Sequence, residues 1–153
     1  MSHSDHPGTQ LAAKLIDSLK NALGLSELAF EEGCCALKVN DIAINMQLEE
    51  NEERIVFSAY LAELPQTADS ILLEQLLIGN LYWQAGATIC LEPRTRSLLM
   101  LDMHVLQGMA PERLKDELQK FAVSVDECRK NLQTYERQPA HRKRHLQRAG
   151  RTS

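Results

Sequence analysis

Apolar residues recur at helical spacing near the start of the chain and then switch to the two-residue spacing of strands. Residues 9–23 carry the helical pattern, and Gly24 follows it as a stop signal. From residue 33 onward, apolar and polar residues alternate in three successive runs, which predicts three strands. Asn40-Asp41 favours a turn between the first two runs, and Pro65 ends the third. The pattern therefore predicts an amphipathic helix followed by three strands.

Residues 68–83 (ADSILLEQLLIGNLYW) are apolar around nearly the whole circumference of a helix. A helix that is apolar on all sides must be buried on all sides. One face can pack on the sheet, but a domain of this size leaves little chain to cover the opposite face. We therefore expect a second copy of the chain to cover it.

Two further strands and a last helix complete the pattern. ATICLE and SLLMLDMHVL form a second hairpin around Pro93–Arg96, and Pro111 with Glu112 opens the helix. One face of that helix carries an apolar stripe of Leu114, Leu118, Phe121, Val125, Cys128 and Leu132. The expected fold is α+β, an α-β-β-β-α-β-β-α sandwich with a largely antiparallel sheet, homodimeric.

Charge is distributed unevenly along the 153 residues, whose formal net charge is -4. Residues 137–153 hold six basic residues and no acidic one, so the rest of the chain carries a charge of -10. We expect residues 1–8 to be disordered, 9–136 to form the domain and 137–153 to be a flexible basic tail. The acidic body disfavours nucleic acid as a partner, and 5% aromatic residues offer no stacking platform. The tail is better suited to solubility or to an acidic partner.

The chain has no apolar run long enough to predict a membrane span, and its polar start lacks the pattern of a secretion signal. We therefore expect a cytoplasmic protein. The four cysteines form no CxxC pair and are interpreted as reduced, mostly buried residues.

Motifs for catalysis, phosphate binding or metal binding are absent from the sequence. We therefore expect no enzymatic activity, no cofactor and no metal. His104 could activate a cysteine, but a lone histidine at a strand end is more often a packing residue. His141 and His145 could chelate a metal only if the tail were helical. The acidic run 49–53 is interpreted as a solvated hairpin tip, with a metal loop as the weaker alternative.

Residues 72–101 (LLEQLLIGNLYWQAGATICLEPRTRSLLML) resemble the class I chaperones of bacterial type III secretion, the CesT/SycE-like family. The similar features are a leucine-rich second helix with Asn-Leu near its end, Gly-Ala-Thr before a strand, and an acid with proline before the next strand. The hairpin CCALKVNDIAINMQLEE agrees, and the resemblance spans residues 9–135. Two features depart from the family: Arg96 replaces a turn glycine, and the basic tail has no counterpart.

The resemblance implies a cytoplasmic bacterial homodimer that binds the N-terminal, non-globular segment of a secreted effector without ATP. It keeps that effector soluble and competent for secretion, and the ATPase of the secretion apparatus is a further candidate partner. An adaptor or regulator of secretion gene expression on the same fold is the alternative. The expected dimer residues are Leu72, Leu76, Trp83, Leu99 and Leu101. The expected effector-binding residues are Leu11, Leu15, Ile42, Ile44 and Phe57, for each of which a core position is the open alternative.

Overall fold

The fold was analysed in a computed structural model, which describes residues 7–23, 33–49, 53–64, 70–82 and 87–136. The helices and strands follow one another in the predicted order, so the α+β prediction is confirmed. In chain order they are α1 (Pro7–Leu23), β1 (Cys34–Val39), β2 (Ile42–Glu49), β3 (Arg54–Glu63), α2 (Ser70–Tyr82), β4 (Thr88–Glu92), β5 (Ser97–Val105) and α3 (Pro111–Glu136).

The five strands form one antiparallel sheet in the order β1-β2-β3-β5-β4. Asn40 and Asp41 both adopt positive φ, which suits the tight turn of the β1–β2 hairpin. Arg96 also adopts a positive φ of 56° at the end of the β4–β5 turn. This turn therefore keeps the left-handed conformation that a glycine would favour, although an arginine occupies the position.

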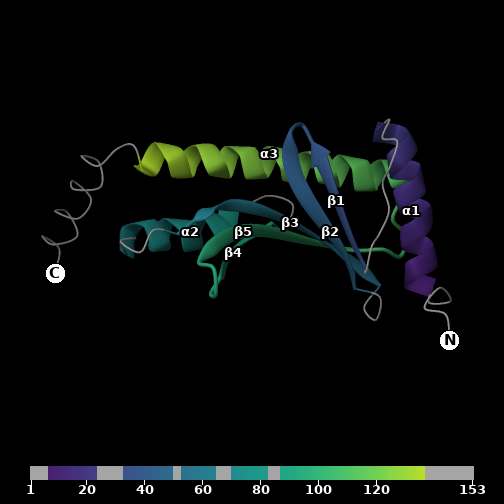
Figure 1. Ribbon diagram of the computed structural model, residues 1–153, viewed down its shortest axis with the longest axis horizontal. Helices are drawn as coiled ribbons and strands as arrows, with labels where there is room; N and C mark the ends of the chain where they lie inside the picture. The colour runs from purple at the N-terminus through teal and green to yellow at the C-terminus, as the bar shows by residue number, and fades with distance from the viewer. Residues whose placement is uncertain (1–6, 24–32, 50–52, 65–69, 83–86, 137–153) are drawn as a thin grey trace, which may run out of the picture.

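Helices α1 and α3 cover one side of the sheet, and α2 lies at the edge strand β4, where it shares a pocket with the C-terminal half of α3. The long helix α3 runs along the molecule, with α1 beside its first turns and α2 at the other end, next to β4 (Figure 1). The inward residues of the strands alternate with outward ones, and the ring of Phe57 contacts that of Phe121 on α3 at 5.7 Å between centroids. The core therefore fills the space between the sheet and α3.

The apolar stripe predicted for the last helix is confirmed, because all six of its residues are buried. The first helix begins at Pro7, two residues before the predicted start, and proline suits the first turn of a helix. Residues 1–6 and the basic tail, 137–153, lie outside the described residues. None of the described helices is long and apolar enough to cross a membrane.

Candidate protein-binding surfaces

The rotation of α2 about its axis is fixed by a side chain near its end. The amide of Asn80 accepts a hydrogen bond from the backbone N–H of Ile89 at 2.6 Å and donates one to the Ile89 carbonyl at 3.2 Å. These two backbone groups belong to the outer side of β4, an edge strand of the sheet. Asn80 therefore satisfies part of the β4 edge and anchors α2 beside it.

The outward side of α2 carries three exposed apolar side chains, Leu73, Leu77 and Ile78, which we call the α2 outer face. Leu77 is the most exposed of them, at 71%. The sequence prediction that one apolar side of this helix lacks a cover within its own chain is therefore confirmed for the described residues. Exposed apolar side chains of this size on one helix are typical of an interaction surface.

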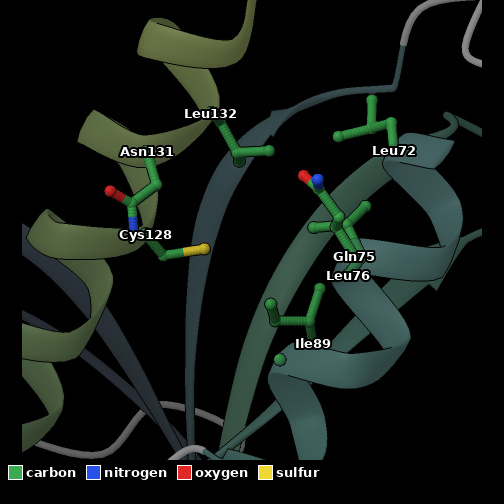
Figure 2. Close-up of a pocket in the computed structure, with 8 residues that line it drawn as sticks. Leu72, Gln75, Leu76, Ile89, Cys128, Asn131 and Leu132 are labelled. Carbon is green, nitrogen blue, oxygen red and sulfur yellow. The ribbon is translucent and has the colours of Figure 1, made fainter. Parts of the chain in front are cut away.

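The inward side of α2 lines a pocket of about 290 Å³ that it shares with β4 and the C-terminal half of α3 (Figure 2). Gln75 and Asn131 are its polar side chains, and the remaining walls are mostly apolar. The lining residues are Leu72, Gln75, Leu76, Gly79, Ile89, Cys128, Asn131 and Leu132. The pocket can receive an apolar side chain or a short apolar segment.

The side of the sheet opposite α3 is apolar along most of β5 and at single positions of β3 and β4, and it is more polar over β2. We call the apolar part the open sheet face. Its residues occupy alternate, paired positions, as the pairs Val56–Met103 and Tyr60–Leu99 show. Met103 and Val105 are more than half exposed. The members of the open sheet face are Val56, Tyr60, Cys90, Leu99, Leu101, Met103 and Val105.

The residues expected at the dimer interface fall into two groups. Leu99 and Leu101 lie half-buried on the open sheet face, directed away from the helices. Leu72 is buried and Leu76 half-buried, because both line the pocket on the inward side of α2. Trp83 lies outside the described residues. The exposed positions of α2 are instead Leu73, Leu77 and Ile78, which were not among the residues expected at the dimer interface.

Four of the five residues expected to bind the effector lie in the core. Ile44 and Phe57 are 1% and 0% exposed, and Leu15 and Ile42 are also buried. The alternating pattern directs these strand side chains toward α3 and α1, so the structure favours the core alternative for them. The side chain of Leu11 lies outside the described ones. Whether an effector touches any of the five stays a prediction.

A polar cluster lies where β5 faces α3, and the sequence analysis missed it. Asp102 and His104 occupy inward positions of β5, and Glu117 reaches them from α3. His104 Nε2 lies 2.8 Å from Oδ2 of Asp102 and 3.9 Å from Oε2 of Glu117. One feature of the sequence could have revealed this cluster. Asp102 continues the alternation of Leu98 and Met100, so an acidic residue occupies a position of β5 that faces the core. Among the described residues, His104 thus has carboxylates as its polar partners.

Two of the four cysteines, Cys35 and Cys128, are buried, and Cys34 and Cys90 are half-buried. All four are free, as predicted. Burial raises the pKa of the Cys128 thiol from 9.0 to about 11, and it also raises the pKa of Cys90. Both shifts keep these thiols protonated and poorly nucleophilic near neutral pH.

Comparison with known proteins assigns the family by sequence, and solved structures share the fold. The model of the Tir chaperone protein (CesT) family matches residues 14–129, more than half of the chain. The Tir chaperone of Escherichia coli is 24% identical over 115 residues, which are 73% of this chain and 73% of that protein.

Two solved complexes contain chains with a similar fold. The HopA1–SchA chaperone–effector complex matches 78% of this chain and 94% of that chain at 18% identity, with a TM-score of 0.65. A chain of the ExsC–ExsE complex matches 80% of this chain and 93% of its own length at 14% identity, with a TM-score of 0.69. Given the family match over residues 14–129, the chain belongs to the Tir chaperone protein (CesT) family and is a class I type III secretion chaperone.

Proposed function

We propose that this protein binds the N-terminal, non-globular segment of a secreted effector in the bacterial cytoplasm and keeps it soluble and competent for secretion. Family membership supports this, as does the likeness to a chain of a chaperone–effector complex. The proposal needs no nucleotide and no catalytic step, because apolar contact and strand pairing suffice to hold an extended chain. Its role would therefore be binding rather than catalysis.

A homodimer is part of the proposal. The observation that carries it is the exposure of apolar side chains at Leu73, Leu77 and Ile78 on α2 and at Met103 and Val105 on β5. Leaving this surface in water costs about 25 cal/mol for every square ångström of apolar area. A second copy that covers the α2 outer face and the open sheet face, with Leu99 and Leu101 within it, removes that cost.

The effector would pair with β1. The two edges of the sheet are β1 and β4, and Asn80 already occupies the backbone groups of Ile89 on β4. On β1, the bond from Leu48 N–H to the Gly33 carbonyl sets the ladder register. Antiparallel geometry then directs the backbone groups of Cys34, Ala36 and Lys38 away from β2. An extended apolar segment can add to this edge by β-augmentation.

Binding to a co-expressed cargo tests the function. The cargo is the first hundred or so residues of the protein encoded beside this gene, titrated into the purified chaperone without ATP. We expect a complex with a strongly negative heat-capacity change and unprotected cargo amides outside the contact, since a disordered segment buries a large area on binding. A cargo that stays globular when bound would contradict the chaperone mechanism. Binding to a transcription regulator instead would favour the adaptor alternative.

Ala36→Pro tests the edge. Proline removes the outward N–H that a cargo strand would use, while the ladder to β2 does not need it. We expect cargo affinity to fall roughly tenfold, corresponding to one or two lost hydrogen bonds. Ala36→Thr keeps the N–H and serves as the control. Full affinity of the folded Ala36→Pro variant would show that cargo binds elsewhere, and would leave the chaperone function itself intact.

A further inference from the structure

Asp102 is the one buried charged residue among those that the structure describes, with 4% of its surface exposed. Its carboxylate contacts the imidazole of His104, and no described lysine or arginine forms an ion pair with it. A buried carboxylate normally requires a positive partner or a metal, because removing the charge from water is costly. The demand for positive charge is greater here because a second carboxylate, Glu117, approaches the same imidazole nitrogen.

The available cations offset this charge only weakly. Lys120 Nζ lies 3.9 Å from the other oxygen of Glu117, and the lysine side chain is 65% exposed. A proton on His104 would leave the three groups with a net charge of -1. A divalent cation beside a neutral imidazole would balance both carboxylates completely.

The three donor atoms are already close enough to share one ion. One carboxylate oxygen each of Asp102 and Glu117 and one imidazole nitrogen of His104 all lie within 4.8 Å of one another. Donors around a tetrahedral Zn²⁺, at about 2.0–2.2 Å from the metal, are separated by roughly 3.3–3.5 Å. The separations of 2.8 and 3.9 Å from the imidazole nitrogen bracket that range, and the two carboxylates lie within 4.8 Å of each other, so side-chain rotation would have to bring all three donors onto one ion.

The surroundings hold the imidazole in position and leave a route for an ion. The ring of His104 packs on Phe57 with centroids 5.0 Å apart, which restricts its rotation. The side chains of His104 and Glu117 keep 10% and 14% exposure, so the cluster reaches the surface. One imidazole and two carboxylates suit a borderline transition metal better than Ca²⁺, which takes six to eight oxygen ligands.

We propose that Asp102, His104 and Glu117 form a binding site for a divalent transition-metal ion of the zinc type, with water as the fourth ligand. The ion ties the inward side of β5 to the first half of α3. It stabilises the protomer without taking part in catalysis, and the site is separate from the α2 outer face and the open sheet face.

The full-length chain, stripped of metal with a chelator and dialysed, tests this site. Zn²⁺ at a hundred times its dissociation constant should raise the melting temperature by roughly 5–10 °C. Co²⁺ should give the visible absorption of a tetrahedral nitrogen–oxygen complex. Glu117→Gln, at the most exposed ligand, should abolish both signals while keeping the fold. Asp116→Asn, a neighbouring exposed carboxylate on α3, should change neither.

Three outcomes would overturn the proposal. The first is the absence of Zn²⁺ binding at equimolar concentrations in the micromolar range, which would leave the cluster a hydrogen-bonded packing feature. The second is a thiolate-to-cobalt charge-transfer band, which would place the metal on cysteine. The third is a cobalt spectrum that survives Glu117→Gln but is lost in the double variant His141→Gln/His145→Gln, which would place the metal on the tail.

Discussion

Single side chains in this protein show how strongly position decides chemical behaviour. Cys128 lies on the buried stripe of α3 and lines the pocket, and burial raises its pKa to about 11. Asp102 is equally buried but keeps a polar partner in His104. A thiol can be buried without a partner because it stays protonated and uncharged. A charged carboxylate can be buried only with a partner, because removing its charge from water is costly.

The raised pKa predicts that Cys128 is slow to react in the folded protein. At pH 8 roughly one such thiol in a thousand is ionised, against roughly one in ten at the ordinary value of 9.0. Its alkylation by iodoacetamide should therefore be at least about a hundredfold slower in the native chain than in urea. Peptide mass mapping after timed quenching measures the rate. Equal rates in both states would mean that the pocket opens freely.

At the scale of elements, α2 carries the exposed apolar residues on which the proposed dimer rests. Leu77→Asp should weaken the dimer more than about a hundredfold, since it would place an unpaired charge in a dry interface. The protomer should stay folded because Leu77 is exposed within it. Sedimentation equilibrium measures the change against the wild type, for which the proposal expects twice the 17.3 kDa chain mass.

Val123→Asp is the matched control for that variant. Val123 is an exposed apolar residue on α3 with 52% exposure, and it belongs to neither proposed surface. Its replacement should leave dimer affinity within a few-fold. Dissociation by Val123→Asp, or an unchanged dimer in Leu77→Asp, would show that the two copies meet through another surface.

The sequence predicted which helices and strands form, and it predicted the buried stripe of α3 residue by residue. It did not predict which side of α2 faces inward. The helix has apolar residues on all sides, so its sequence does not distinguish a buried face from an exposed one. That choice depends on Asn80 and Ile89, nine residues apart, whose contact exists only in the folded chain. The polar cluster was hidden for the same reason, since Glu117 joins Asp102 and His104 from another element.

At the scale of the whole molecule, the chain combines an acidic body with a basic C-terminal segment. Deleting residues 137–153 should leave the melting temperature within about 2 °C of the full chain, because the segment lacks apolar periodicity and carries like charges. Differential scanning calorimetry measures this directly. A fall of many degrees would show that the segment docks on the body, and loss of one partner alone would identify it as a recruitment element.

The hydrogen bonds of Asn80 at the edge of β4 also bear on how far such a chain can assemble. A filament can grow by strand pairing only when each molecule has two unpaired sheet edges, so that it can pair with one neighbour at each edge. Here the carboxamide of Asn80 occupies the outward backbone groups of Ile89 in the edge strand β4, whereas among the described strands β1 is the other edge. Each occupied position shortens the stretch of β4 that a second sheet could join. The same two hydrogen bonds that anchor α2 would therefore limit edge-to-edge growth between copies of the chain.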